Sequence, residues 1–223
     1  MELHPPEAEA ASELLRERAY REIKNRLALS INPPEPFLSE RKLALQLGMS
    51  NTPVRSAIER LAVEGLIIIS PQQGIIMREL SAKEITDQYE MRQAVEPFVL
   101  RRLAGKLTAD QGRRLRAHLK EQEQSARAGD AAKFVELDSA FHLLFCEFLA
   151  NDEILRTMRQ LRDRIHRLVL RMVRHAPASM SESHADHARV TEAVLRGDGK
   201  PAARLVIEHL EKAKRALAPL GTP

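Results

Sequence analysis

The sequence is poor in cysteine and in aromatic residues: it has one cysteine, no tryptophan and only 4% aromatic side chains among 223 residues. The single thiol, Cys146, excludes an internal disulfide framework. Its position between His142 and Phe148 in a mostly apolar helical stretch favours a small residue at the edge of a core over a nucleophile. A reducing compartment suits this composition, and we expect a cytoplasmic protein.

Long hydrophobic runs are also absent from the sequence. No stretch approaches the ~18 apolar residues of a membrane-spanning helix, and the opening residues "MELHPPEAEAASELL" lack a basic region followed by an apolar segment. We therefore expect neither export nor a membrane partner. Acidic and basic residues nearly balance, with a formal net charge of +4. A charge this modest permits an anionic partner without identifying nucleic acid.

The first third of the chain predicts a small domain of helices and a hairpin. Residues 1–12 are expected to be a disordered tail, and helical periodicity then runs through about residue 27. The prolines of "INPPEPF" interrupt it, and two further helical patterns flank the short bridge at residues 48–50. The β-branched runs "GLIIIS" and "GIIMREL", separated by "PQQ", predict a β-hairpin. Three helices followed by a hairpin predict a winged helix-turn-helix over residues 13–79.

Five residues of this region are candidates for contacts with double-stranded DNA: Arg41, Asn51, Thr52, Arg55 and Gly74. The second helix of a helix-turn-helix pair places its N-terminal residues in the major groove. Arg55 can bond a guanine or a phosphate through two N–H groups, and Thr52 can donate to a phosphate. Arg41 is expected to add a backbone contact, while Gly74 lets the wing approach the minor groove closely. On periodicity alone, a helical domain with a charged surface explains these residues equally well.

The rest of the chain predicts a helical bundle. Residues 80–83 are expected to form a linker, and Ser81 with Glu84 gives the capping-box pattern of a helix start. Six amphipathic helical patterns follow without any strand pattern, and the connections between them are short. We therefore expect an antiparallel all-α helical bundle over residues 84–220, in a protein that is mainly α.

The stretch "KFVELDSAFHLLFCEFL", residues 133–149, places polar residues on a face that is expected to be buried. On a helical wheel Asp138 and His142 share the face of the phenylalanines and of Leu149. An unpaired buried carboxylate costs several kcal/mol, and a buried imidazole also needs hydrogen-bond partners. The sequence must therefore supply partners for both side chains inside the protein.

The last two helical patterns each carry an inward-facing histidine, His187 and His209. A single buried histidine is more often a core residue bonded to a carbonyl than a metal ligand. Four residues of ligand type on three helices, two of them at i and i+4, favour a metal site instead. Three imidazoles and a carboxylate suit Zn²⁺, Ni²⁺ or Mn²⁺, whose charge would make the burial of Asp138 tolerable. We therefore expect Asp138, His142, His187 and His209 to bind one divalent metal ion.

The stretch "FLSERKLALQLGMSNTPVRSAIERLAVEGLIIISPQQGIIM", residues 37–77, closely resembles the DNA-binding part of GntR-family transcription regulators. The matching features are Ser-Glu-Arg at 39–41, Leu-Ala at 43–44, Thr-Pro-Val-Arg at 52–55, Arg-Leu at 60–61, Glu-Gly-Leu at 64–66 and Gly74. The resemblance implies DNA binding through a winged helix-turn-helix. The family usually has arginine where this chain has Asn51. Because asparagine pairs best with adenine and arginine with guanine, the operator sequence is left open.

The residues after 84 resemble the FCD effector-binding domain of the FadR subfamily of GntR regulators. The matching features are Tyr89 to Arg92 with Glu96, "DSAFH" at 138–142, Asn151, "DHARVTEAVLRGD" at 186–198 and "EHL" at 208–210. In metal-binding members, as the resemblance implies, the aspartate and three histidines hold the ion, and a small carboxylate effector reaches it or a nearby arginine. We assign Arg92 to this anion, through bidentate pairing. A salt bridge from Arg92 to Glu96, one helical turn on, explains the residue equally well.

Together these features predict a transcription regulator, a repressor or an activator, that binds DNA and responds to a small organic acid. Helix-turn-helix proteins commonly dimerise to read two half-sites, so a homodimer is expected. Two alternatives remain. The metal could be purely structural or itself the signal, and a metal-dependent hydrolase could also present three histidines and an aspartate to a bound water. Because no further inward-facing general base is evident, we expect no catalytic residues and no enzyme activity.

Overall fold

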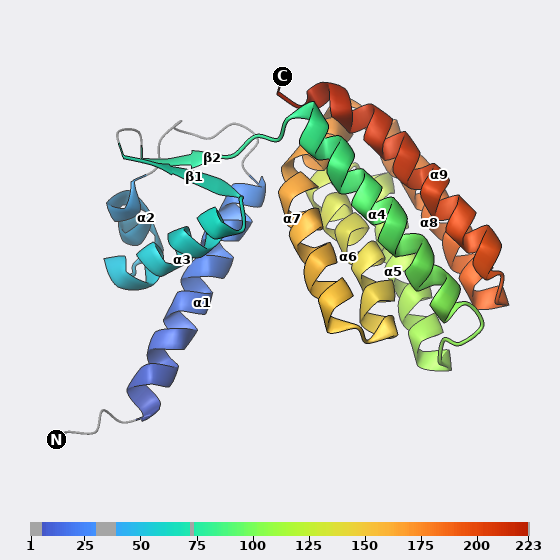
Figure 1. Ribbon diagram of the computed structural model, residues 1–223, viewed down its shortest axis with the longest axis horizontal. Coiled ribbons are helices and arrows are strands. Elements are labelled where there is room, and N and C mark those ends of the chain that lie inside the picture. Colours follow the sequence, from blue (N-terminus) through green and yellow to red (C-terminus); the bar gives the residue numbers. More distant parts are fainter. Residues whose placement is uncertain (1–5, 30–38, 72–73, 223) are drawn as a thin grey trace. The chain divides into compact units, whose positions relative to one another are not determined.

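The computed structural model describes residues 6–29, 39–71 and 74–222. The chain divides into two compact units, Met1–Arg78 and Glu79–Pro223, and each has its own fold (Figure 1). Helices dominate both units, and the sheet found among the described residues has two strands. The predicted fold is therefore confirmed: the first unit is a winged helix-turn-helix and the second is a helical bundle.

The first helix, α1, spans Pro6–Leu29 and begins earlier than expected. The prediction of a disordered tail through residue 12 is wrong from Pro6 onward, and residues 1–5 lie outside the described residues. Proline is tolerated in a first helical turn because its missing N–H has no partner there, and the alanines and glutamates that follow favour a helix. The inner face of α1 is buried through Ala19, Tyr20, Ile23 and Leu27.

Helices α2 (Glu40–Leu47) and α3 (Asn51–Val63) form the helix-turn-helix. Ser39 caps α2 by accepting a hydrogen bond from the Lys42 N–H. Gly48 ends α2 with a φ of 62°, a left-handed conformation that a residue without a Cβ adopts without strain. The apolar stripes of α2 and α3 pack with α1 on one core, to which Leu43, Leu47, Val54, Ile58 and Leu61 contribute.

Strands β1 (Ile67–Ser70) and β2 (Gly74–Met77) form the predicted hairpin. They pair antiparallel, with Ser70 opposite Gly74 and Ile67 opposite Met77. Ile67 and Ile75 turn inward onto the core of the first unit. Residues 72–73 of the connecting turn, and the proline-rich stretch at 31–37, lie outside the described residues. The hairpin is the wing of this unit.

Six helices make up most of the second unit. They are α4 (Ala82–Leu103), α5 (Ala109–Ala128), α6 (Ala131–Leu149), α7 (Asp152–His175), α8 (Ala178–Arg196) and α9 (Gly199–Leu217), followed by a short 3-10 turn, Ala218–Leu220. Short connections join them into the expected bundle, in which α4 packs along α9 and α6 contacts both α5 and α7 (Figure 1). None of the described helices is long and apolar enough to cross a membrane.

The predicted capping box is present at the start of α4. Ser81 Oγ accepts from the Glu84 N–H at 3.2 Å, and the Glu84 carboxylate accepts from the Ser81 N–H at 3.0 Å. The helix therefore begins at Ala82, so two residues of the expected 80–83 linker belong to α4. Leu80 is buried, and Ser81 forms a bridge with Thr222 at the other end of the unit. The bundle thus begins before residue 84, because the capping box and these contacts fix its first turn.

Candidate functional site

The first candidate site is the N-terminal turn of α3. Asn51, Thr52 and Arg55 are exposed and line an open hollow of about 420 Å³. Helix α1 adds Arg16 to the same hollow. Sequence reasoning missed Arg16, since an exposed arginine in an amphipathic helix carries no motif. Two guanidinium groups beside the free N–H groups of a helix start suit an anionic partner such as a phosphate.

Arg55 is held in place by a carboxylate of the preceding helix. Its Nε donates to Glu40 Oε1 and Oε2 at 3.1 and 3.2 Å, while its side chain remains 65% exposed. An exposed ion pair of this kind contributes little to stability, because water screens its charges. A phosphate or a base can therefore displace Glu40 from Arg55 at little cost.

The other two candidates for DNA contacts, Arg41 and Gly74, lie on different elements. Arg41 is exposed at the second position of α2, and Gly74 opens β2 with a φ of 80°. Glycine adopts this left-handed conformation freely, which explains the residue at the strand start. Neither residue lines the hollow at α3. The structure thus brings together three of the five predicted residues and places the remaining two on α2 and on the wing.

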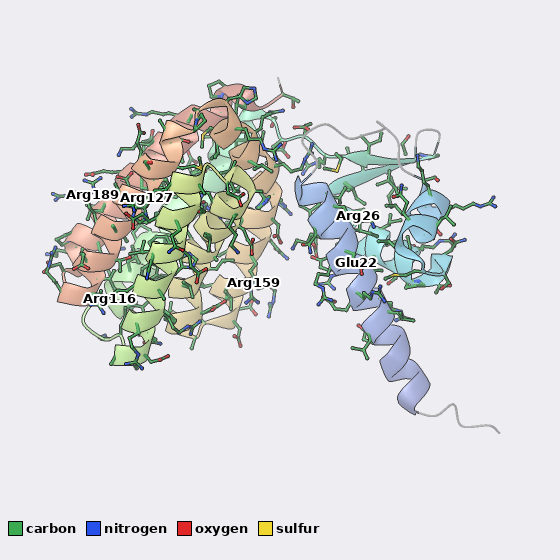
Figure 2. The ribbon with its side chains drawn as sticks, turned by 180° about the vertical axis from the view of Figure 1, so that it is seen from behind. Glu22, Arg26, Arg116, Arg127, Arg159 and Arg189 are labelled. Atoms are coloured by element: carbon green, nitrogen blue, oxygen red, sulfur yellow. The ribbon has the colours of Figure 1, made fainter. Side chains whose placement is uncertain are left out.

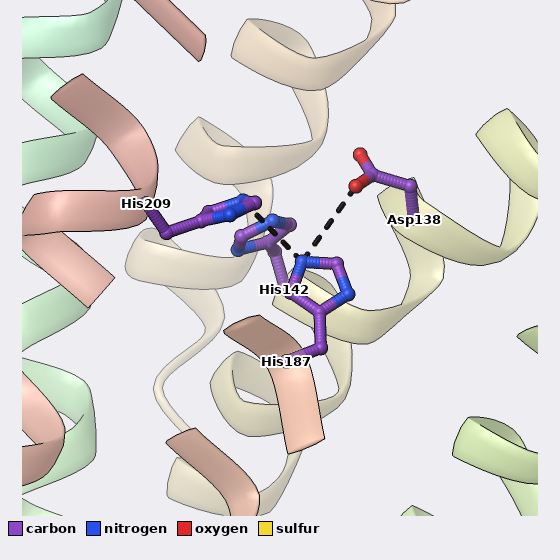
Figure 3. Close-up of side chains that lie close together, drawn as sticks. All are labelled: Asp138, His142, His187 and His209. Carbon is purple, nitrogen blue, oxygen red and sulfur yellow. Dashed lines mark hydrogen bonds and ion pairs between the residues drawn. The ribbon is translucent and has the colours of Figure 1, made fainter. Parts of the chain in front are cut away.

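The second candidate site lies in the centre of the bundle (Figure 3). Asp138 and His142 lie one turn apart on α6, His187 lies on α8 and His209 lies on α9. All four are buried, and each offers one ligand atom within 4.8 Å of the others. Two ligand atoms on opposite sides of an ion, each ~2.1 Å from it, are ~4.2 Å apart. The four residues predicted as metal ligands therefore do come together, at nearly the spacing that one ion requires.

Each histidine of this cluster is held through Nδ1 by a side chain outside the cluster. His142 Nδ1 lies 2.6 Å from Glu96 Oε2, His187 Nδ1 lies 2.9 Å from Gln122 Oε1, and His209 Nδ1 lies 3.5 Å from Asp186 Oδ2. Because these oxygens accept hydrogen bonds, they favour an N–H on each Nδ1, and a ring with its single proton there carries a lone pair on Nε2. Imidazoles oriented in this way are typical of metal ligands.

The three Nε2 atoms consequently face the centre of the cluster as acceptors. His187 Nε2 lies 3.3 Å from His209 Nε2 and 3.6 Å from Asp138 Oδ1 (Figure 3). His142 Nε2 is buried and has no hydrogen-bond partner among the described residues. Lone pairs at this spacing repel one another, whereas a divalent cation between them would bind them all. The donor set and its orphaned nitrogen therefore fit a metal ion.

Asp138 also has a protein partner that the sequence did not identify, Arg162 of α7. The two side chains form a buried ion pair, and Ser183 Oγ donates to Asp138 Oδ1 at 3.3 Å. Burial alone would raise the pKa of Asp138, but the positive charge of Arg162 contributes to holding that pKa well below its usual value. The expectation that a metal alone makes this burial tolerable is therefore corrected. A signal was available, since Arg162 shares the buried stripe of Met158 and Ile165.

Two imidazoles of the cluster, those of His142 and His187, are in the protonation state that binds a metal. Burial lowers the pKa of His142 to about 4, against the opposing effect of Glu96, and burial also holds the pKa of His187 well below its usual value. Both rings are therefore neutral near pH 7 and offer Nε2 lone pairs. Cys146, expected at the edge of the core, is buried, and burial raises the pKa of its thiol to about 12, which makes it a poor nucleophile.

Arg92 lies beside the cluster, and the salt bridge considered above is present. Its Nε donates to Glu96 Oε1 at 2.7 Å, and both side chains are buried. One terminal nitrogen, Nη2, is buried without a hydrogen-bond partner among the described residues. Since an unsatisfied buried guanidinium N–H is costly, Arg92 retains a donor that is suited to an anion.

A cavity of about 120 Å³ connects Arg92 with the cluster. Asp138 and His209 line it from the cluster, Arg92 and Arg162 add guanidinium groups, and Lys212 adds an ammonium group. Two acidic residues, Glu182 and Asp186, and two serines complete its polar lining. The remaining wall is largely apolar and comprises Phe134, Val169, Met172, Val173, Ala213, Ala216 and Leu217, with the ring of Tyr89. The polar lining thus contains guanidinium, ammonium and carboxylate groups, and the rest of the wall is largely apolar.

Comparison with known proteins identifies two parts of the chain that correspond to its two units. Residues 15–77 match the family model described as bacterial regulatory proteins, gntR family, and residues 87–212 match that of the FCD domain. The Nta operon transcriptional regulator of Aminobacter aminovorans is 31% identical over 180 residues, 80% of this chain and 83% of that protein. The HTH-type transcriptional repressor RspR of Escherichia coli (strain K12) is 27% identical over 203 residues, 90% of this chain and 88% of that protein. These relatives are regulators and not enzymes, so the hydrolase interpretation has no support.

Solved structures share the fold at low sequence identity. Escherichia coli McbR/YncC has a TM-score of 0.82 at 21% identity, covering 92% of this chain and 98% of that chain. A putative GntR transcriptional regulator from Rhodococcus sp. RHA1 also has a TM-score of 0.82, at 19% identity, covering 93% of this chain and 99% of its own. At these identities the likeness establishes the fold alone.

Proposed function

Since this chain belongs to the GntR family of bacterial regulatory proteins and carries an FCD domain, it is a transcription regulator, and we propose that a small organic acid bound beside a metal ion controls its affinity for DNA. The observation that carries the proposal is the cavity in the second unit. It joins two candidate metal ligands, Asp138 and His209, to the unsatisfied guanidinium of Arg92.

In the proposed DNA complex, the N-terminal turn of α3 meets the major groove. Arg55 leaves its exposed carboxylate partner and bonds a guanine or a phosphate, while Thr52 donates to a phosphate. Asn51 pairs with an adenine edge, where an arginine would prefer guanine. Arg41 contacts the backbone from α2, and Gly74 lets the wing lie close to the minor groove.

The proposed metal is a divalent ion of the Zn²⁺, Ni²⁺ or Mn²⁺ class, held by Asp138, His142, His187 and His209. Imidazole nitrogen with one carboxylate oxygen suits these borderline ions better than Ca²⁺ or Mg²⁺, which prefer oxygen ligands throughout. When bound, the ion supplies a positive charge and can offer a coordination position to a carboxylate oxygen. The residues themselves fix the ring orientations and hold the proton of each imidazole on the outer nitrogen.

The proposed effector is a small carboxylate with an apolar remainder. Arg92 and Arg162 line the cavity together with Asp138 and His209 of the cluster, and guanidinium groups bind carboxylates by paired, charge-assisted hydrogen bonds. Other lining residues, including Val169, Val173 and Leu217, offer an apolar surface. The cavity volume of about 120 Å³ is well below the ~300–1,000 Å³ of pockets for drug-sized ligands, which favours a short molecule.

The proposed regulator works as a homodimer that reads two operator half-sites, as helix-turn-helix proteins commonly do. An effector changes DNA affinity only if it binds the DNA-competent arrangement of the dimer and the alternative arrangement unequally. We favour repression as the effect on transcription, because the relative from Escherichia coli is a transcriptional repressor. If the metal is structural, or is itself the signal, no carboxylate effector takes part in regulation, while DNA binding remains.

A titration of short mono- and dicarboxylates against the metal-loaded protein tests this proposal. Calorimetry measures binding, and fluorescence anisotropy of labelled operator DNA measures its release or capture. We expect at least one carboxylate to bind and to change DNA affinity, and we expect both effects to vanish after chelation. Carboxylate binding that survives chelation would place the anion site away from the metal. If no carboxylate binds while DNA binding responds to the metal alone, the metal is the signal.

A further inference from the structure

We propose that two copies of this chain associate through the outer face of α4 and α9, with their α4 helices antiparallel across a two-fold axis. The inference names the surface used by the proposed homodimer and does not depend on the metal or on the effector. It rests on the distribution of apolar and charged side chains in the second unit.

Exposed large apolar side chains gather on this face. In the described part of the second unit four large hydrophobic residues are exposed: Met91 at 47%, Phe98 at 46%, Ile207 at 41% and Leu220 at 36%. The first three lie on α4 and α9, which lie side by side along their lengths (Figure 1). A single exposed apolar residue is ordinary, but three on two neighbouring helices indicate a surface that another molecule covers.

The exposed side of α4 has the spacing of a helix–helix seam. Asp87, Met91, Ala94, Phe98 and Arg102 are all exposed, and they follow one another at steps of three or four residues. Side chains at such steps form one stripe along a helix, as the a and d positions do in a coiled coil. The opposite side of α4 is buried in the bundle. The helix therefore has a second, solvent-exposed face with the residue spacing of a helix–helix interface.

The stripe is complementary to itself when reversed. Asp87 and Arg102 lie equally far along the chain from its midpoint beside Ala94, and so do Met91 and Phe98. In two antiparallel copies that cross at this midpoint, Asp87 of each copy faces Arg102 of the other, and Met91 faces Phe98. The small side chain of Ala94 permits close approach at the crossing, and sulfur–aromatic contacts are favourable.

This reversal symmetry is what selects a second copy of the same chain as the partner. A two-fold interface pairs residue i with j and residue j with i, so a self-complementary stripe fits it. A parallel arrangement would place Asp87 against Asp87 and Arg102 against Arg102, which is unfavourable. The antiparallel arrangement is therefore the one that the charges support.

The reverse side of the bundle differs in character. Seen from behind, Arg116 and Arg127 of α5 and Arg159 of α7 project from the surface (Figure 2). All three are exposed. Neither α5 nor α7 carries an exposed large hydrophobic residue within the described part of the second unit, so this side offers less apolar area to a partner. The apolar area available for association lies on α4 and α9.

Sedimentation equilibrium of the full chain measures the association. We expect the wild type to dimerise and Phe98→Glu to raise the dimer dissociation constant at least about 100-fold, because each dimer buries two copies of this residue. Leu220→Glu introduces the same charge at an exposed apolar position outside α4 and α9. We expect it to leave the dissociation constant unchanged. Circular dichroism and metal content establish that each variant is folded.

Exchange of charges tests the antiparallel geometry itself. Asp87→Arg or Arg102→Asp alone places like charges opposite each other twice per dimer, so each should weaken association about tenfold at low salt. The present partner of Asp87, Lys83 at 2.6 Å, is exposed and easily displaced. When the two variants are mixed, both contacts again join opposite charges, so the heterodimer should form in preference to either homodimer.

The possible results distinguish the proposed interface on α4 and α9 from dimerisation itself. A monomeric wild type overturns the homodimer and the face together. A wild-type dimer that tolerates Phe98→Glu overturns the face alone and leaves the proposed function in place. If the single charge variants weaken the dimer and their mixture does not restore it, the antiparallel pairing is wrong.

Discussion

His187 and His209 direct their Nε2 atoms at each other across 3.3 Å in the centre of the bundle. Their outer nitrogens face Gln122 and Asp186, which leaves a lone pair on each inner nitrogen. Asp138 adds an anionic oxygen 3.6 Å from His187 Nε2. A fold that brings imidazole lone pairs and a carboxylate oxygen together gains stability when a cation binds among them. The proposed ion should therefore stabilise the bundle whether or not an effector is present.

Removal of the metal is expected to lower the free energy of unfolding. An ion bound only by the folded state at about 100 to 1,000 times its dissociation constant contributes roughly 3–4 kcal/mol. Denaturant unfolding with and without a chelator measures the difference. The His142→Ala variant is the control, since a site that lacks one ligand should respond less to the chelator. Identical unfolding curves for the wild type in both conditions would contradict the account.

Glu96→Gln is expected to weaken metal binding about 10- to 100-fold, because Glu96 orients His142 by accepting from its Nδ1–H. Competition with a chromophoric chelator measures the affinity. The matched control is Glu211→Gln, a change of the same kind on α9 at a partly exposed residue that bonds Gln93 instead. Equal affinities for Glu96→Gln and the wild type would show that this carboxylate does not position the ring.

Arg55→Ala is expected to weaken binding to the specific operator by about 1–3 kcal/mol, the usual worth of a bidentate base contact. Glu40→Gln should act in the opposite direction, since it removes the carboxylate that competes for the guanidinium. Arg18→Ala, at an α1 arginine bonded to Glu22, is the control. Fluorescence anisotropy with operator DNA measures all three. Unchanged operator affinity in Arg55→Ala would remove this residue from the DNA interface.

Arg92→Lys is expected to reduce carboxylate affinity at least about tenfold while metal content stays at the wild-type level, because lysine cannot form the paired hydrogen bonds of a guanidinium. Lys212→Gln, at a residue whose side chain is 62% exposed at the same cavity, should have a smaller effect. Calorimetry with a carboxylate that binds the wild type measures both. A larger loss of carboxylate affinity in Lys212→Gln would show that Lys212, and not Arg92, is the main residue that binds the anion.

Most of the architecture could be predicted from the sequence because amphipathic helices and hairpins are local patterns. Most of the buried face of α6 was predicted correctly, including Asp138 and His142, but Phe148 and Leu149 at its end are only partly buried. The first helix was predicted too short, because Pro5 and Pro6 suggested a loose segment although proline suits a first helical turn. Local propensity therefore predicted the presence of each helix and strand better than the positions of its first and last residues.

The partners of the site residues were harder to predict because they are distant in the sequence. Gln122 and His187 are 65 positions apart, and Glu96 and His142 are 46 apart. Helical periodicity shows that a side chain faces inward but does not show which inward side chain it meets. Arg162 illustrates the limit, since its place on a buried stripe was visible in the sequence while its pairing with Asp138 required the bundle.

Metal content shows directly whether Asp138, His142, His187 and His209 bind an ion. Mass spectrometry of untagged protein would compare the wild type with His187→Ala and His209→Ala, and with His175→Ala, an exposed histidine bonded to the Arg171 carbonyl. We expect about one metal equivalent in the wild type and in His175→Ala, and its loss in the two cluster variants. A wild type without metal, even after incubation with Zn²⁺, Ni²⁺ and Mn²⁺, would contradict this expectation and would make these histidines hydrogen-bonded residues of the core.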